Sequence, residues 1–236
     1  MKAAPLTSDL SGLKQVLEAR GFAVVPERFS EAEINTMCSL TASRFGDDSL
    51  AGNRGALRWP WVKEIARDSR IRAIVDSTLG EDSDVVRGIL FDKQPGANWN
   101  LGYHQDRAIA LAARREAAGY VGWSEKDGVP HALAPAELLE HMLAVRISLD
   151  DCGPDNGPLR VLPGTHRDGL LSRTAVVHLQ AVLEEEVCVL NRGGVVLMKP
   201  LLLHASSAAT SPNHRRVLHL EFARPVLPTG LAFYIW

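Results

Sequence analysis

The sequence predicts a mainly β protein, an antiparallel double-sheet jelly roll (a double-stranded β-helix) packed on N-terminal α-helices. Two observations predict this fold class. In the first third of the 236-residue chain, apolar residues recur at helical spacing, whereas from Val85 onwards short strand-like runs dominate. Tight-turn signals, among them Asn156-Gly157 and Pro163-Gly164, separate these runs.

Before residue 85 we expect helices and one early strand. In chain order these are a helix that follows Ser8-Asp9 and ends at Gly21, a strand over residues 22–25, a helix that begins with the capping box of Ser30 and Glu33, and helices from Pro60 and over about residues 69–79. These helices would support the β region that follows.

After residue 85 we expect a series of strands interrupted by one helix. The strands are predicted over residues 85–93, 103–109, 142–149, 159–162, 187–190, 194–198, 201–206 and 215–223, and the helix over about 170–185. Between Ala110 and Leu139 we expect an Ala-rich helical piece and then a loop that carries Trp123 and His131. An insertion of this length in a β region is often a lid or binding loop. We therefore expect one domain, residues 1–236, with mainly helical support over 1–84 and a jelly-roll core over 85–224 that carries a lid-like insertion at 107–140.

The composition is that of an ordinary globular protein, with 46% hydrophobic residues, 23% charged residues and a formal net charge of -2. No cluster of Lys and Arg favours nucleic acid as a partner, so a small-molecule substrate is expected. The cysteines, Cys38, Cys152 and Cys188, are odd in number and form no CxxC pair, which favours a reducing cytoplasm over disulfides or a cysteine zinc site. The start of the chain lacks the apolar core of a signal peptide, and no apolar run reaches membrane-spanning length. We expect a cytoplasmic monomer or homodimer.

The tripeptide His104-Gln105-Asp106 is the main chemical signal in the sequence. In a strand, side chains two residues apart project to the same face, so His104 and Asp106 would lie side by side. An imidazole and a carboxylate are two of the three ligands of a 2-His-1-carboxylate facial triad, which leaves positions open on Fe(II). Alone, such a tripeptide more often consists of surface residues.

The third ligand has to come from elsewhere in the chain, and His204 is the best candidate. It ends the predicted apolar strand that contains Leu201-Leu202-Leu203, which would direct it inward, and Ser206 would share its face. The alternative for His204 is a hydrogen-bonded core histidine. His166 is a rival ligand, but it follows a Pro-Gly turn. The other histidines fall in predicted loops or helices or, for one, on the last strand, where a supporting role is open: His131, His141, His178, His214 and His219.

Arg215 and Arg216 begin the last strand and must point to opposite faces. Arg216 shares its face with apolar residues and is assigned to the outside. A buried arginine needs an anionic partner, and its planar fork matches a carboxylate. Arg215 is therefore assigned to a carboxylate cosubstrate, with a structural ion pair as the alternative.

In chain order, a set of segments resembles the phytanoyl-CoA dioxygenase family of iron(II)/2-oxoglutarate oxygenases. The segments are Phe91-Asp92-Lys93, Trp99, Tyr103-His104-Gln105-Asp106, Asn156-Gly157-Pro158-Leu159, Pro163-Gly164-Thr165-His166, and His204-Ala205-Ser206 followed by Arg215. The likeness runs from about residue 21 to residue 224, and the ordered set is far more specific than the tripeptide. The apolar tail over residues 231–236 departs from the family pattern, and it could cover the site, pack on the helices or form a dimer contact.

The resemblance implies that His104, Asp106 and His204 bind iron(II). It implies that Arg215 and Ser206 hold the distal carboxylate of 2-oxoglutarate and that Lys93 contacts this cosubstrate, although a surface lysine is the alternative. The implied activity is that of a dioxygenase that uses O2 to hydroxylate, or otherwise oxidise, a small molecule with release of succinate and CO2. Hydroxylation is favoured over halogenation because related halogenases lack the carboxylate ligand. Candidate substrate contacts, chosen by position, are Trp99, Tyr103, Arg107, Trp123, Arg54 and Arg146, the last of which interrupts an apolar strand.

Two other classes of protein remain open at this point. A cupin-like metalloenzyme, such as a zinc hydrolase or an isomerase, could use the same three ligands without 2-oxoglutarate, and it would not need Arg215. A binding or scaffold protein without catalysis would need neither the metal nor the arginine.

Overall fold

The computed structural model describes residues 10, 12–42, 52–210 and 214–236. The helices are α1 (Leu13–Arg20), α2 (Glu31–Ala42), α3 (Pro60–Arg67), α4 (Ser69–Leu79), α5 (Ala136–Leu139) and α6 (Arg173–Val182), with short 3-10 helices η1 (Ala56–Arg58) and η2 (Thr165–Asp168). The strands are β1 (Phe22–Val25), β2 (Gly52–Asn53), β3 (Asp84–Lys93), β4 (Leu101–His104), β5 (Ala108–Ala110), β6 (Val121–Lys126), β7 (Val129–Leu133), β8 (Met142–Ser148), β9 (Leu159–Val161), β10 (Glu186–Cys188), β11 (Val195–Met198), β12 (His204–Ser206) and β13 (Arg215–Ala223).

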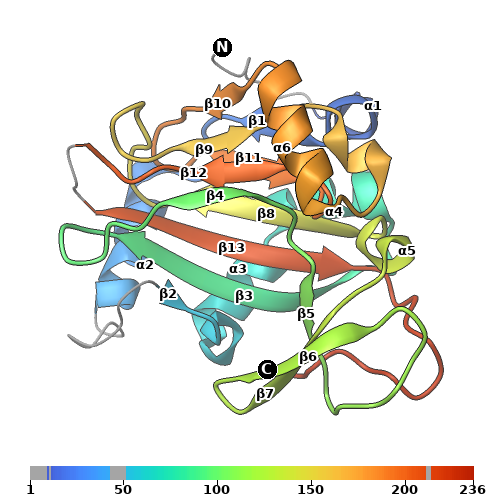
Figure 1. Cartoon of the computed structure of the whole chain (residues 1–236). Coiled ribbons are helices and arrows are strands. Elements are labelled where there is room, and N and C mark those ends of the chain that lie inside the picture. Colours follow the sequence, from blue (N-terminus) through green and yellow to red (C-terminus); the bar gives the residue numbers. More distant parts are fainter. Residues whose placement is uncertain (1–9, 11, 43–51, 211–213) are drawn as a thin grey trace.

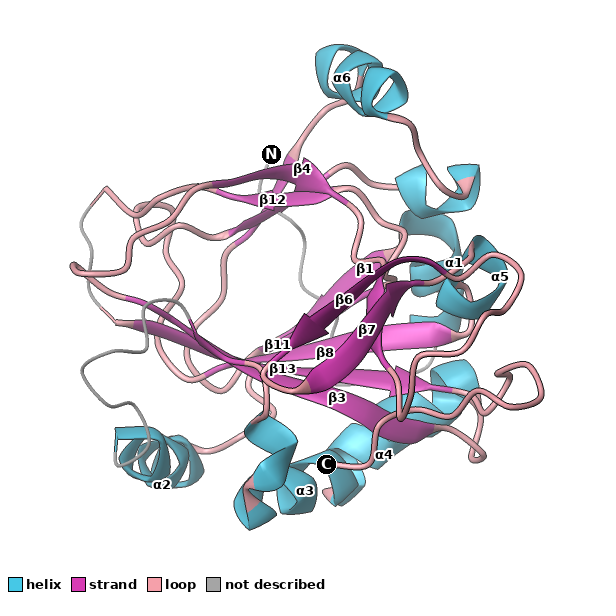
Figure 2. Cartoon of the chain, turned by 60° about the horizontal axis from the view of Figure 1, so that its bottom comes forward, coloured by secondary structure: helices cyan, strands magenta, loops and turns pink. Residues whose placement is uncertain are grey.

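Two antiparallel sheets face each other across the interior (Figures 1 and 2). The larger sheet has the strand order β1-β11-β8-β13-β3-β2, and the smaller one has the order β10-β9-β12-β4. A third sheet, β5-β7-β6, lies in front of one end of the larger sheet. The predicted mainly β fold on supporting helices is thereby confirmed.

The N-terminal helices form where their end signals predict them. Gly21 ends α1 with a φ of 79°, and its N–H donates to the Leu17 carbonyl. At the start of α2, the backbone N–H of Ser30 donates to Oε2 of Glu33 at 2.8 Å, and the N–H of Glu33 donates to Oγ of Ser30 at 3.4 Å. The predicted capping box is therefore confirmed. The expected start of α1 at residues 8–9 lies outside the described residues.

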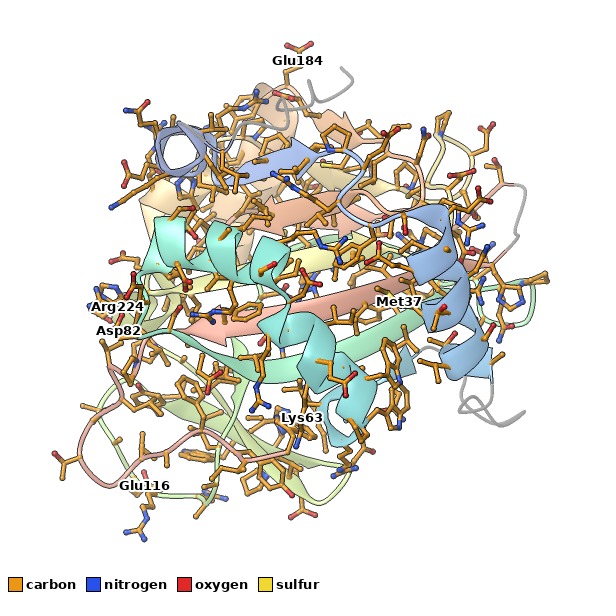
Figure 3. All side chains as sticks on the ribbon, turned by 180° about the vertical axis from the view of Figure 1, so that it is seen from behind. Met37, Lys63, Asp82, Glu116, Glu184 and Arg224 are labelled. Carbon is orange, nitrogen blue, oxygen red and sulfur yellow. The ribbon has the colours of Figure 1, made fainter. Side chains whose placement is uncertain are left out.

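The main core lies between these helices and one face of the larger sheet, as the view from behind shows (Figure 3). Residues at every second position of β8, Leu143, Val145 and Ile147, belong to this core. The intervening residues, including Arg146, therefore face the space between the two sheets. The larger sheet thus has an apolar outer face and an inner face that is free to carry polar groups.

The central strand β13 pairs with β3 on one side and β8 on the other, in registers that set Arg215 opposite Lys93 and His219 opposite Arg146. Its outer residues, Leu218, Leu220 and Phe222, enter the helix-covered core. The predicted two-faced character of this strand is confirmed, and Arg215 lies on its inner face.

The predicted Ala-rich helix in the insertion is wrong, because no helix forms between Ala110 and α5. Trp123 lies in β6 and His131 in β7, rather than in a loop. The turn Asp127-Gly128, with φ values of 52° and 75°, joins these two strands as a two-residue hairpin. Asp-Gly is a strong signal for this kind of turn, and it outweighs the helix propensity of the alanines. Movement of the insertion as a lid stays a prediction.

Two predicted strands are shorter than expected. The strand predicted over 103–109 ends at His104 and resumes at Ala108, so Asp106 lies in the connection between β4 and β5. The strand predicted over 201–206 begins only at His204, after a buried turn that contains Leu201. In both places the chain passes from one sheet to another, from β4 to β5 and from β11 to β12.

The C-terminal tail packs on the helices and on the insertion sheet. The Trp236 indole N–H donates to the Val86 carbonyl at 2.9 Å, and Nζ of Lys63 in α3 donates to the Trp236 carbonyl at 2.6 Å. The Tyr234 N–H donates to the carbonyl of Ala110 in β5 at 3.1 Å. Of the three expected roles of the tail, packing on the helices is therefore confirmed. Among the described residues, none of the helices is long and apolar enough to cross a membrane.

Candidate metal centre

Two strands of the smaller sheet bring the three predicted ligands together. β12 pairs with β4 in a register that sets His204 directly opposite His104. Asp106 follows β4, and its backbone N–H donates to the Pro200 carbonyl at 2.9 Å, which ties this connection to the segment that leads to His204. Residues about a hundred positions apart in the sequence are therefore neighbours in the fold.

The ligand atoms of His104, Asp106 and His204 all lie within 4.8 Å of one another. Nε2 of His104 is 3.6 Å from Oδ1 of Asp106, and Nε2 of His204 is 3.5 Å from Oδ2 of the same carboxylate. The two imidazole rings have centroids 4.2 Å apart. Two histidines and one carboxylate in this spacing fit the donor set of a 2-His-1-carboxylate metal site.

Backbone carbonyls determine which ring nitrogen of each histidine faces the centre. Nδ1 of His104 lies 2.9 Å from the Gly102 carbonyl, and Nδ1 of His204 lies 2.9 Å from the Leu202 carbonyl. Because a carbonyl only accepts, each Nδ1 carries the proton and each Nε2 has its lone pair free for a metal. The residue two positions before each histidine thus orients its ring.

Burial and the shared carboxylate shift the pKa values of the three groups. Burial lowers the pKa of His204 to about 4, against an opposing effect of Asp106. For His104, burial lowers the pKa, but Asp106 raises it by more. Burial raises the pKa of Asp106, yet the neighbouring histidines hold it well below its usual range. A negative carboxylate beside a neutral His204 suits a divalent cation.

Gln105 lies between two of the candidate ligands and holds three segments of the chain together. Its role was missed by sequence reasoning. Its side-chain amide donates to the Gly169 and Leu201 carbonyls at 2.8 and 2.7 Å, and its Oε1 accepts from the Leu171 N–H at 3.0 Å. The segment before His204 and the segment before α6 are thereby attached to the residue between His104 and Asp106. A polar residue flanked by candidate ligands was the available signal.

The triad opens into a cavity of about 100 Å³ between the two sheets. Its lining includes charged residues of the larger sheet, aromatic residues and the three candidate ligands: Arg87, Ile89, Phe91, Trp99, Leu101, His104, Asp106, Arg146, Leu159, His204, Ala205, Ser206, Arg215, His219 and Glu221. A cavity that combines apolar and charged side chains with a candidate metal centre at its wall can hold small ligands.

Arg215 and Arg216 behave as their strand positions predict. Arg215 is 3% exposed and lines the cavity, its Nε has no hydrogen-bond partner, and no ion pair to it occurs among the described residues. Arg216 instead forms a bidentate ion pair with Asp150, at 2.6 and 2.9 Å. The structural ion pair considered for Arg215 therefore belongs to its neighbour.

Lys93 and Ser206 lie beside Arg215. Lys93 is 1% exposed, so the surface-lysine alternative is wrong. Its Nζ donates to Oγ of Ser206 at 2.9 Å and to the Ser207 carbonyl, and Ser206 Oγ lies 3.1 Å from the Gly157 carbonyl. Burial and the charge of Arg215 lower the pKa of Lys93 to about 8. Two cationic groups therefore lie close together at this end of the cavity, and of these Arg215 lines it.

A second polar network, also missed by sequence reasoning, crosses the inner face of the larger sheet. Arg87 forms a bidentate pair with Glu221, through Nε at 2.9 Å and through Nη2. Nε2 of His219 lies 3.1 Å from Glu221 Oε1, and Nδ1 of His219 accepts from Arg146 at 2.9 Å. The inner positions of β3 and β13 alternate with core residues, which was the signal for this network.

The candidate substrate residues divide into two groups. Trp99 and Arg146 line the cavity. The other four do not line it. The Tyr103 hydroxyl donates to Glu185, and Trp123 packs against the core of the insertion. Arg54 is exposed, and Arg107 is also absent from the cavity lining. Of the rival ligands, His166 bonds the Glu18 carbonyl at 3.1 Å and is not part of the cluster.

A family model described as Phytanoyl-CoA dioxygenase (PhyH) matches residues 17–217. The chain belongs to this family. Membership confirms the predicted family and fold, and with them the general activity, that of an oxygenase that depends on iron and 2-oxoglutarate. A search of the curated proteins found no match.

The fold of this PhyH protein is also similar to solved structures. EctD from S. alaskensis in its apoform is 17% identical, with a TM-score of 0.70 over 94% of this chain and 80% of that chain. HygX from Streptomyces hygroscopicus, with nickel, 2-oxoglutarate and hygromycin B bound, is 16% identical, with a TM-score of 0.67 over 90% and 86%. SnoN, a non-heme alpha ketoglutarate dependent epimerase from nogalamycin biosynthesis, is 16% identical, with a TM-score of 0.69 over 95% and 85%. At such identities the likeness concerns the fold alone.

Proposed function

We propose that this chain is a hydroxylase that uses Fe(II), 2-oxoglutarate and O2 to oxidise a small molecule, with release of succinate and CO2. His104, Asp106 and His204 hold the iron, and Arg215, with Ser206 and Lys93, binds the distal carboxylate of 2-oxoglutarate. The observation that carries the proposal is a three-ligand cluster and an unpaired buried arginine that share one cavity.

The residues present fit both groups. Three protein ligands leave positions open on Fe(II) for a chelating cosubstrate and O2, and both Nε2 atoms already face the shared carboxylate. The guanidinium of Arg215, which forms no ion pair with a carboxylate of the described residues, provides the planar donor pair that a carboxylate requires. Bound there, iron and 2-oxoglutarate would supply the oxidising power for attack on a substrate C–H bond, with loss of CO2 from the cosubstrate.

The protein's own residues position the ligand groups and shape the cavity. The carbonyls of Gly102 and Leu202 keep both imidazoles in one tautomer, and Gln105 holds the two ligand-bearing segments together. At the other end, Ser206 and Lys93 place a hydroxyl and an ammonium group near Arg215. Phe91 and Trp99, with ring centroids 6.4 Å apart, form an apolar part of the cavity wall.

Hydroxylation is proposed because Asp106 occupies the position where a halogenase would lack a carboxylate. Epimerisation, desaturation or ring chemistry would start from the same hydrogen abstraction, and the structurally similar protein SnoN is described as an epimerase. Product analysis separates these outcomes, because only hydroxylation adds one oxygen atom from O2 to the product.

The decisive experiment is the anaerobic addition of Fe(II) and 2-oxoglutarate, followed by the visible absorption of the chelate. We expect a band in the wild type and at least a tenfold weaker affinity for 2-oxoglutarate in Arg215→Met, because the variant loses a charged, bidentate contact. Arg216→Met is the matched control, since it removes the neighbouring arginine on the outer face.

Absence of the band, together with no succinate from any substrate, would reject the assignment of the cosubstrate. Full activity in Arg215→Met would instead favour a cupin-like hydrolase or isomerase without 2-oxoglutarate. Partner binding that survives removal of the iron, with no turnover, would favour a binding or scaffold protein.

A further inference from the structure

Arg146 is the charged group of the cavity that the proposed function leaves without a role. It lies on the inner face of β8, beside His219 of β13, and its guanidinium carbon sits 5.7 Å from the centroid of the Phe91 ring. It lines the same cavity as the metal ligands and Arg215. A charged side chain in this place is costly unless something compensates its charge.

No carboxylate of the described residues forms an ion pair with Arg146. The cavity lining contains two carboxylates, Glu221 and Asp106. Glu221 is occupied by its bidentate pair with Arg87, and Asp106 lies between the two ligand histidines. Among the described residues, Arg146 takes part in no ion pair, and its side chain donates a hydrogen bond to the neutral acceptor Nδ1 of His219 at 2.9 Å.

The bond to His219 holds the guanidinium in a fixed place. Because Arg146 can only donate, Nδ1 of His219 accepts, and its Nε2–H must donate to Glu221. Glu221 is in turn held by Arg87. This chain of bonds uses one nitrogen of the Arg146 fork and leaves the others available, so the group is oriented in advance for a ligand.

Among the residues that line the cavity, the charges also leave Arg146 in excess, because Lys93 contacts Ser206 beside Arg215 but is not part of the lining. Arg87 and Glu221 neutralise each other, and Asp106 offsets part of the charge of a divalent metal. The two carboxylates of 2-oxoglutarate would balance Arg215 and the rest of the metal charge. Arg146 then has no anion left to neutralise it. Burial and the charge of Arg215 lower its pKa to about 10 and outweigh the opposing effect of Asp106.

We propose that Arg146 binds a negatively charged group, a carboxylate or a phosphate, of the primary substrate. This inference rests on the proposed function and names the substrate class. The substrate would place its anionic group on Arg146 and its apolar part against Phe91 and Trp99, which brings it beside the metal centre in the same cavity.

The test uses the full chain loaded with Mn(II) and saturating 2-oxoglutarate, so that Arg215 is already occupied. Butyrate and methyl phosphate are titrated as anionic probes, and butyramide as the neutral counterpart of butyrate, while the melting temperature and the dissociation constant are measured. We expect the anions, but not butyramide, to raise the melting temperature saturably. In Arg146→Met the dissociation constant of the anions should rise at least tenfold, which corresponds to about 1.4 kcal/mol.

Two further variants control for charge and folding. Arg224→Met removes an exposed arginine that pairs with Asp82 at 3.3 Å on the surface (Figure 3), and it should bind the probes like the wild type. Arg146→Lys keeps the charge, and it should bind the probes more tightly than Arg146→Met, even if the methionine variant is less stable.

Several outcomes would overturn the inference. The wild type could fail to respond to either anion, or Arg146→Met could bind the anions as tightly as the wild type. A loss of 2-oxoglutarate affinity in Arg146→Met as large as that in Arg215→Met would assign the guanidinium to the cosubstrate instead. If the wild type binds no 2-oxoglutarate, the proposed function fails, and the comparison of Arg146→Met with the wild type on Mn(II) protein alone still decides the role of Arg146.

Discussion

Loss of the guanidinium of Arg87 should destabilise the protein strongly, because its partner Glu221 would stay buried. Both side chains are almost fully buried, at 8% and 6% exposure. Removal of one member of a buried ion pair typically costs about 3–5 kcal/mol. For a chain of this length, each kcal/mol lowers the melting temperature by about 2–4 °C, so Arg87→Met should melt roughly 6–20 °C below the wild type.

The effect should depend on pH in a defined direction. In the wild type, burial raises the pKa of Glu221, but Arg87 and His219 outweigh it and the pKa lies below its usual 4.5. That lowered pKa contributes stability above pH 4.5, and the contribution is lost as the pH falls through the folded-state value. In Arg87→Met, burial dominates and the pKa rises above 4.5, so the penalty is full near pH 7 and fades as Glu221 becomes protonated. The stability difference should therefore shrink between pH 7 and pH 4.5.

Urea unfolding followed by circular dichroism at both pH values measures this difference. The double variant Arg87→Met/Glu221→Gln should regain most of the loss, because Gln removes the stranded charge and still accepts from His219. Arg224→Met, at an exposed pair, should cost less than about 1 kcal/mol. A loss below about 1 kcal/mol in Arg87→Met, or a double variant as unstable as the single one, would refute the reasoning.

Three other predictions concern the helices, the thiols and a turn. Hydrogen bonds from Arg70 and from Ser30 lower the pKa of Glu33 to about 2. The stabilisation that Glu33→Gln removes should therefore be present above pH 4.5 and vanish as the pH falls toward 2. Acid unfolding of the wild type and the variant measures this difference. Burial raises the pKa of Cys188 to about 12, so mass spectrometry after brief alkylation at pH 8 should find this thiol unmodified until the protein is unfolded. Gly193 has a φ of 82°, and a Cβ there would lie 2.4 Å from the Phe29 carbonyl oxygen. Gly193→Ala should therefore lower the free energy of unfolding in urea by about 1–3 kcal/mol. An unchanged urea midpoint would contradict the expected backbone strain.

Much of the fold was predictable because many elements carry local signals. Capping residues at Ser30 and Glu33 and the stop at Gly21 act within a few residues, and they form as predicted. The Ala-rich insertion shows the limit of such reasoning. Its alanines favour a helix locally, but the Asp127-Gly128 turn and pairing with a distant strand outweigh that preference.

The candidate site was predictable for a different reason. His104 and Asp106 are close in sequence, and their residue types match one ligand set. The strand argument for them was only partly correct, because Asp106 lies beyond the end of β4. They converge all the same, since the backbone of Asp106 is tied to Pro200 in the segment before His204.

The sequence by itself determined the class of fold, the family and the residues that can serve as metal ligands, because these depend on residue type, order and local spacing. Only the tertiary structure decided that Asp150 pairs with Arg216, how Glu221, His219 and Arg87 orient Arg146, and that Lys93 is buried. Those facts depend on strand register between segments far apart in the chain, and a shift of one residue would turn each of these side chains to the opposite face of the sheet.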